Sequence, residues 1–291
     1  MSDTNIQLYL LSVLTLFGAA LGSFLNVVIG RMATELSIVF PGSRCPRCLT
    51  PLKWYENVPI LAWFVQRGRC RHCGTRIAFR YVLLELITAV LVAALFLRLG
   101  LTLTFLQWLI LSSLLVVIVF YDIDYWIIPD RIVLPGAVVA LIFALLPEGI
   151  GLRAALWGLI PAGLIYATGW VFERVTGKEG LGFGDVKLLL MLGLALGLMP
   201  TLTLLFLASV QGVLAGIVVS FGGGHPDRLQ EEPPRVTDIL EYDPEDDWEP
   251  PPRAIPFGPF LALGAFEVVL LPEIFLDVPR AWVIDLVSTT L

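Results

Sequence analysis

The sequence predicts an all-α polytopic membrane protein with about eight transmembrane helices and a small zinc-binding cytoplasmic loop domain. Of the 291 residues, 57% are hydrophobic and only 15% are charged, and the mean hydropathy is +0.84. A soluble domain of this size could not bury so much apolar surface in one core. The charges and all four cysteines are also segregated along the chain, which separates membrane segments from a soluble segment.

Eight apolar runs give the predicted helices. A run of about 20 apolar residues is long enough to cross the hydrocarbon core of a bilayer. The first run has no positively charged leader and no small-residue cleavage site, so we expect a retained span. It ends in Gly22 to Asn26, small and polar residues that favour close helix packing. The runs cover residues 6–29, 81–97, 103–121, 131–147, 153–172, 186–199, 201–221 and 257–272.

Residues 30–80 are predicted to form a basic loop domain. They contain nine Arg or Lys against two Glu, together with all four cysteines. An excess of basic residues marks cytoplasmic loops, so we place this loop in the cytoplasm. Alternate threading of the spans then puts residues 122–130, 173–185 and 222–256 on the same side, with the loop near residue 200 outside.

The cysteines form two pairs, Cys45-x-x-Cys48 and Cys70-x-x-Cys73. Four thiolates in this pattern predict a tetrahedral, structural zinc site with no open position. Nearby arginines are expected to favour the thiolate forms. Two disulfides or four free thiols are the alternatives, and His72 is expected to be a bystander.

Asp185 is the most informative single residue. It lies between a glycine-rich turn, Gly180 to Gly184, and a long apolar run. An ionisable group at the start of a membrane helix faces a cavity or the bundle interior. Alternatively, it could simply cap the helix N-terminus. The glycines would let another segment approach the backbone closely.

Asp122 and Asp124 lie where the third span meets the cytoplasm. They could be two interfacial acids that end a helix. The functional interpretation pairs one of them with Asp185, so that one carboxylate activates water and the other, protonated, polarises a scissile carbonyl. Pro129 and Asp130 are expected to start the next helix.

Together, these residues resemble the type IV prepilin peptidase family of bacterial bifunctional leader peptidases and N-methyltransferases. The resemblance covers nearly the whole chain. It rests on Gly22 to Ile29, the two cysteine pairs, Glu56 to Ile60, Arg67 to Cys70, Arg80-Tyr81 with Glu85, Asp122 seven residues before Pro129, Gly182 to Lys187, and Pro256 to Phe260.

The resemblance implies an aspartic endopeptidase whose catalytic pair is Asp122 and Asp185. Its neighbours Gly182, Gly184, Lys187 and Asp124 would support the site. The implied substrates are type IV prepilins or pseudopilins, cut after glycine at the cytoplasmic membrane face. The new N-terminal residue would then be methylated with S-adenosylmethionine. The methyltransferase candidates are Glu56, Asn57, Gly68, Arg80 and Glu85.

The implied setting is the bacterial inner membrane, with pilus or type II secretion assembly proteins as further partners and no nucleic acid. We expect a first helix at 1–29, a zinc loop domain linked to methylation at 30–80, a peptidase domain at 81–272 and a tail at 273–291. Residues 222–256 hold ten acidic residues. This composition predicts a flexible solvated linker, with docking to a basic partner as the alternative.

Three other interpretations remain open from the residues. A transporter or channel could carry a zinc-stabilised cap, because intramembrane acids also relay protons. A signal-peptide-peptidase-like protease would use a similar Gly-x-Gly-Asp site but would not explain the cysteine loop. A peptidase could also have lost methylation.

Overall fold

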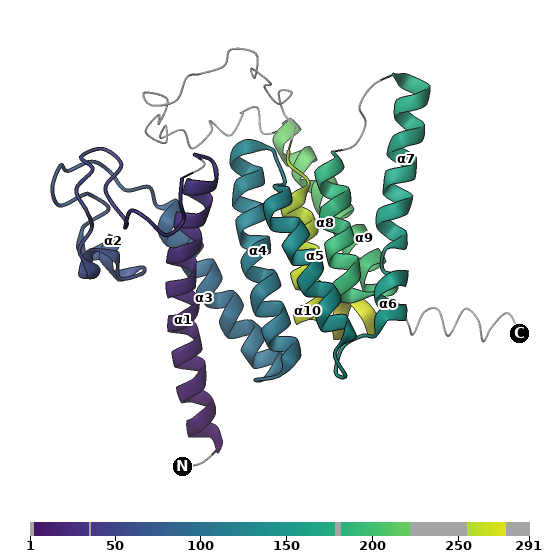
Figure 1. Cartoon of the computed structure of the whole chain (residues 1–291), viewed down its shortest axis with the longest axis horizontal. Coiled ribbons are helices and arrows are strands. Elements are labelled where there is room, and N and C mark those ends of the chain that lie inside the picture. The colour runs from purple at the N-terminus through teal and green to yellow at the C-terminus, as the bar shows by residue number, and fades with distance from the viewer. Residues whose placement is uncertain (1–2, 35, 178–181, 222–254, 278–291) are drawn as a thin grey trace, which may run out of the picture. The chain divides into compact units, whose positions relative to one another are not determined.

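The computed structural model describes residues 3–34, 36–177, 182–221 and 255–277 (Figure 1). Within these ranges the chain forms helices and two isolated β-bridges, with no strand, so the all-α prediction is confirmed there. Most of the acidic segment 222–256 and of the tail 273–291 lies outside the described residues.

The described residues form two compact units, which we treat separately. The first extends to Leu97 and includes the end of α9, and the second comprises Arg98–Val218 with residues 255–277. The first unit holds α1 (Asp3–Met32), the 3₁₀ helix η1 (Trp54–Asn57), α2 (Leu61–Val65) and nearly all of α3 (Arg80–Leu99).

Glycines on α1 let it pack directly against the backbone of α3. A Cβ atom added to Gly22 would lie 2.7 Å from Glu85 Cα, and one added to Gly18 would lie 2.9 Å from Ala89 Cα. Two small residues four positions apart bring membrane helices into close contact. One turn further on, Asn26 Nδ2 donates to the carbonyl of Tyr81 at 3.1 Å. The close packing predicted for this stretch is confirmed.

The second unit is a helical bundle. Its helices are α4 (Leu103–Tyr125), α5 (Asp130–Leu145), α6 (Leu152–Trp157), α7 (Ile160–Thr176), α8 (Phe183–Leu196), most of α9 (Leu198–Phe221), α10 (Gly258–Leu270) and the π-helical turn η4 (Glu273–Asp277). Both α5 and α10 contact α4 and α8 (Figure 1). The helices α4 and α8 therefore share two neighbours.

Among the residues that the structure describes, five helical segments reach the length and hydropathy of a membrane span: Thr4–Met32, Arg80–Leu99, Leu103–Tyr125, Leu152–Thr176 and Leu198–Phe221. The chain is thus a multi-pass membrane protein. All eight predicted runs are helical, but α5, α8 and α10 have 16, 14 and 13 residues. At 1.5 Å per residue these helices are about 24, 21 and 20 Å long, shorter than a hydrocarbon core of about 30 Å.

The break expected near residue 200 lies a few residues earlier. Gly197, with φ +80°, ends α8, and α9 begins at once with Leu198. A positive φ suits glycine, because a side chain would clash in this conformation. A single residue, Gly197, therefore separates α8 from α9.

Enlarging Gly22 should push α1 away from α3. We expect Gly22→Leu to destabilise the protein by about 1–3 kcal/mol, as overpacking of a close contact does. Thermal unfolding of the detergent-solubilised protein would measure this as a lower midpoint. The matched control is Gly30→Leu on the same helix, because a Cβ at Gly30 would meet no atom within 4 Å. Equal midpoints for the two variants would contradict the predicted packing.

Candidate functional site

Asp122 is a buried acid in the last turn of α4. Its residue is only 5% exposed, whereas Asp124 is exposed. The helix ends at Trp126, whose left-handed backbone directs its N–H to the Asp122 carbonyl at 2.9 Å. Burial therefore distinguishes the two acids and favours Asp122, the acid that the resemblance implied, as the member of an internal site.

Asp185 is a half-buried acid in the first turn of α8. The N-cap of α8 is Gly182, which makes no side-chain cap, and the N–H of Asp185 donates to the Gly182 carbonyl at 3.1 Å. The alternative in which Asp185 serves as the helix N-cap is therefore wrong. Its carboxyl group remains available for another role.

Ile128 and two glycines connect the two acids. A Cβ added to Gly184 would lie 2.9 Å from Ile128 Cβ, and one added to Gly258 would lie 3.2 Å from Ile128 Cδ1. The same atom at Gly258 would lie 2.5 Å from Asp122 Oδ2. Only residues without a side chain fit at these two positions. Gly184, which precedes Asp185 in the chain, and Gly258, which contacts Asp122, thus both pack on Ile128.

The Asp122 carboxylate lies directly against the backbone of Gly258, because a Cβ at that position would lie 2.5 Å from Asp122 Oδ2. The carboxyl groups of Asp122 and Asp185 also interact electrostatically. The structure therefore brings together the two acids that the sequence paired, although 62 positions separate them in the chain.

Lys187 does not lie beside the acids as a free cation. Its Nζ forms an ion pair with Asp130 Oδ1 at 2.6 Å and lies 4.6 Å from the centre of the Phe183 ring. Asp130 is the first residue of α5, with Pro129 as its N-cap, as predicted. The pair therefore ties the start of α5 to the start of α8.

The four cysteines converge in the loop domain. All four thiols are free, and their sulfur atoms lie within 4.8 Å of one another. Cys45 Sγ and Cys73 Sγ are 3.7 Å apart. Zinc–sulfur bonds of about 2.3 Å in a tetrahedron place the sulfurs about 3.8 Å apart. The cluster can therefore hold a tetrahedral metal ion, and it does not form the alternative disulfides.

Each cysteine pair is carried by the same turn, which repeats at an offset of 25 residues. The N–H of Cys45 donates to the Thr50 carbonyl, and the N–H of Cys70 donates to the Thr75 carbonyl. The residue after each pair has positive φ: Leu49 at 57° and Gly74 at 71°. The sequences Arg-Cys-x-x-Cys-x-Thr at 44–50 and 69–75 carry this repeat, which the sequence analysis missed.

The four thiols are electrostatically unequal. Burial raises the pKa of Cys45 to about 11, whereas a hydrogen bond with the Thr50 hydroxyl lowers the pKa of Cys48 to about 6. Backbone N–H groups of Cys73 and His72 lower the pKa of Cys70. The stabilisation of thiolates thus comes mainly from N–H and hydroxyl donors rather than from the arginines expected to supply it.

The five methyltransferase candidates have separate local roles. The N–H of Lys53 donates to Glu56 Oε2 at 2.9 Å, which holds the pKa of Glu56 below its usual value. Buried Gly68, at φ +64°, packs on the Trp63 ring. Glu85 Oε2 accepts from the N–H of Ile60 at 2.6 Å. Asn57 is exposed at the end of η1, and Arg80 begins α3.

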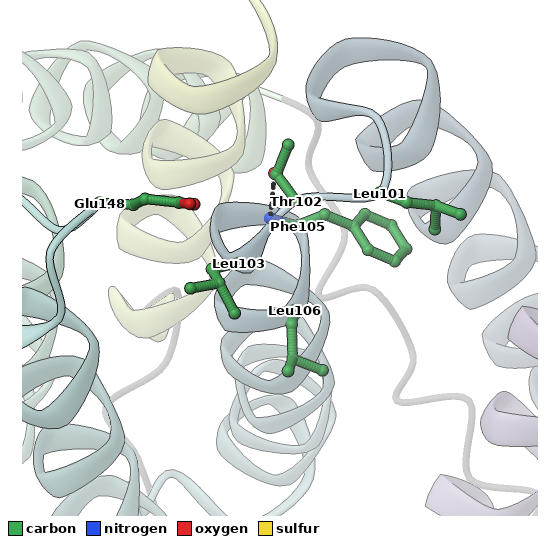
Figure 2. A pocket seen from close by; sticks show the side chains of 6 residues that line it. All are labelled: Leu101, Thr102, Leu103, Phe105, Leu106 and Glu148. Atoms are coloured by element: carbon green, nitrogen blue, oxygen red, sulfur yellow. Dashed lines mark hydrogen bonds between the residues drawn. The ribbon is translucent and has the colours of Figure 1, made fainter.

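These contacts test whether the candidates fit S-adenosylmethionine. Glu56, Gly68 and Glu85 are each engaged within the chain, and they support the loop domain rather than an open pocket. A cavity of about 550 Å³ lies elsewhere, between the start of α4 and Glu148 (Figure 2). The helical rise places it about 28 Å along α4 from Asp122. It therefore belongs to neither candidate site.

Ile128 and Gly258 are site residues to which the sequence assigned no role, although Gly258 lies within the Pro256 to Phe260 stretch that carries the resemblance. A signal for Gly258 was present, because a glycine followed by proline at the start of an apolar run is a poor helix former kept there for another reason. No comparable signal marks Ile128 among so many apolar residues.

Comparison with known proteins gives two family matches. Residues 16–99 match a model described as Bacterial Peptidase A24 N-terminal domain, and residues 109–217 match the Type IV leader peptidase family. Among similar curated proteins, one from Myxococcus xanthus (strain DK1622) is 37% identical, with 89% of each chain covered. One from Aeromonas hydrophila is 34% identical over 89% of this chain and 90% of that protein.

A third relative, from Klebsiella pneumoniae, is 38% identical over 68% of this chain and 90% of its own. All three carry the name prepilin leader peptidase/N-methyltransferase. No solved structure matches the chain significantly.

The repeated turn allows a matched exchange around the metal cluster. A non-glycine residue in the left-handed conformation costs about 1 kcal/mol or more. We expect Leu49→Gly to slow metal release to a chelator about fivefold and Gly74→Leu to accelerate it by a similar factor. Release would be followed with a colorimetric chelator. Changes of the same sign in both variants would contradict the equivalence of the two turns.

Proposed function

Because the chain belongs to the type IV leader peptidase family, we propose that it cleaves the leader peptide of type IV prepilins and pseudopilins and then N-methylates the new N-terminal residue. The observation that carries the peptidase assignment is the junction of Asp122 and Asp185 through Gly258, Ile128 and Gly184. Two facing carboxyl groups can hydrolyse a peptide without a serine or cysteine nucleophile.

We assign the general base to Asp122 and the general acid to Asp185. Asp122 lies against Gly258, the first residue of α10, so the positive end of this helix favours a carboxylate at Asp122. Two neighbouring carboxyl groups do not both ionise readily, so Asp185 carries the proton. Asp122 takes a proton from water as the water oxygen attacks the scissile carbonyl, and Asp185 donates a hydrogen bond to the carbonyl oxygen. The C–N bond then breaks as the proton on Asp122 passes to the leaving amine.

The short helices support this chemistry. α5, α8 and α10 begin at Asp130, Phe183 and Gly258, around the two acids. Helix N-termini carry partial positive charge, so three of them stabilise negative charge that develops on the carbonyl oxygen. Gly182, exposed at the start of α8, adds no bulk where a substrate segment would approach the acids.

We place the acids at the cytoplasmic face of the bacterial inner membrane. The basic loop domain at 30–80 supports this orientation through the positive-inside rule. A prepilin would lie in the bilayer with its leader at this face. Pilus or secretion assembly proteins remain further proposed partners.

We propose zinc as the metal at Cys45, Cys48, Cys70 and Cys73. A four-sulfur shell at tetrahedral spacing suits this ion and leaves no position for a substrate, so its role is structural. The methyl group would come from S-adenosylmethionine. The contacts of Glu56, Gly68 and Glu85 support a role in shaping the loop domain, and no methyl-transfer step follows from them.

Removing either acid should abolish cleavage without unfolding the protein. General acid and base groups each contribute about 100-fold or more to the rate, so we expect at least that loss in Asp122→Asn and in Asp185→Asn. Mass spectrometry of a prepilin mixed with the purified protein would measure it. The product mass would also show whether one methyl group has been added.

The matched control is Asp124→Asn, two residues away and exposed, which should retain cleavage. Cleavage that survives Asp122→Asn and is lost in Asp124→Asn would transfer the base to Asp124. Cleavage that survives in all three variants would overturn the aspartic mechanism.

Metal analysis of the purified protein should find about one zinc ion per chain. Cys45→Ser should remove most of it, because three thiolates form a weaker and more exposed site. Ser43→Ala, just outside the cluster, is the control and should retain the ion. A preparation without metal, or one with an equal amount in Cys45→Ser, would refute the zinc assignment.

A further inference from the structure

The short helix α2 presents an apolar face that no described residue covers. Leu61, Phe64 and Val65 are 64%, 57% and 68% exposed. They lie at positions i, i+3 and i+4, so they share one side of the helix. Contiguous exposed apolar surface of this kind marks an interaction site.

Contacts with the start of α3 fix the position of α2. Glu85, in the second turn of the α3 span, accepts the N–H of Ile60 at 2.6 Å. The Trp63 indole N–H donates to the Ile77 carbonyl at 2.9 Å, and its ring contacts the Phe79 ring edge-on at 5.5 Å. Phe79 directly precedes α3. The helix is therefore attached at both its beginning and its middle to the place where the chain enters the membrane.

The backbone before α2 is strained in a way that Glu85 sustains. Ile60 has φ +62° and ψ −57°, and the N–H of Leu61 donates to the Pro59 carbonyl at 2.6 Å. This is a γ-turn of the rare, strained kind. Such a conformation persists only where surrounding contacts impose it. The buried Glu85 carboxylate of α3 therefore determines the direction in which α2 leaves the turn.

The depth of α2 follows from this attachment. Glu85 lies five residues into α3, or about 7.5 Å along the helix axis from Arg80. Ile60 is bonded to Glu85, so it cannot lie far above the membrane boundary. A bilayer whose hydrocarbon core begins at the start of α3 would therefore meet Leu61, Phe64 and Val65 at the level where lipid headgroups join acyl chains.

The surrounding charge complements a lipid surface. Arg67 and Arg69 follow α2 directly and are exposed, within a loop domain of nine basic and two acidic residues. Bilayer interfaces rich in anionic lipid attract such residues, and short apolar helices flanked by them lie in the interface plane.

We propose that α2 is an interfacial anchor, with Leu61, Phe64 and Val65 inserted at the headgroup–acyl boundary of an anionic bilayer and Glu85 holding the helix in position. The anchor would keep the metal-binding loop domain against the membrane. It does not depend on the proposed peptidase activity.

Photocrosslinking of the full-length protein in nanodiscs tests this proposal. Phe64 would be replaced by p-benzoylphenylalanine, in discs of phosphatidylethanolamine and phosphatidylglycerol. Leu49 would be replaced in the same way as a control, because it is similarly exposed (61%) but lies on a cysteine turn. We expect lipid adducts, identified by mass, to be at least fivefold more abundant at position 64, and to decrease in purely zwitterionic discs.

Two further variants separate anchoring from misfolding. Val65 provides a second labelling position if the Phe64 variant fails to retain metal. Adding Glu85→Ala should reduce the lipid adducts at least threefold, whereas Glu85→Gln keeps an acceptor for the Ile60 N–H and should retain them. Equal adducts at positions 64 and 49, or adducts at 64 to a prepilin or a second copy in place of lipid, would overturn the proposal.

Discussion

The close contact between Gly258 and Asp122 is the interaction on which the candidate active site depends. It requires that residue 258 have no side chain, because a Cβ there would lie 2.5 Å from Asp122 Oδ2. The same glycine packs on Ile128, which packs on Gly184 beside Asp185. Gly258 therefore contacts Asp122 directly and is linked to Asp185 through Ile128.

Helix length is the second constraint on the site. Each of the five long segments is long enough to cross the hydrocarbon core of a bilayer. The short helices α5, α8 and α10 begin close to the two acids. A polar site inside a membrane needs both satisfied backbone groups and access to water. The first turns of the short helices that start at the site supply free backbone N–H donors.

The loop domain has little apolar core of its own, so two groups of polar side chains stabilise its fold. The cysteine cluster brings two copies of one turn together, and its four sulfur atoms are close enough to bind a metal ion. Glu85 then fixes the connection to α3 through the Ile60 N–H. A carboxylate inside a membrane helix is destabilising unless its oxygens have partners. The Glu85 carboxylate accepts the Ile60 N–H, which orients the strained turn and the helix α2 that follows.

The sequence by itself determined the membrane class, the helical runs, the cysteine cluster and the pairing of Asp185 with an acid near residue 122. Hydropathy and ligand spacing are local properties, so they can be read without a fold. Tertiary structure alone decided that Asp122 is buried while Asp124 is exposed, that three helices are short, and that Ile128 joins the site. These features depend on which helices meet, and no local pattern in the chain encodes such contacts.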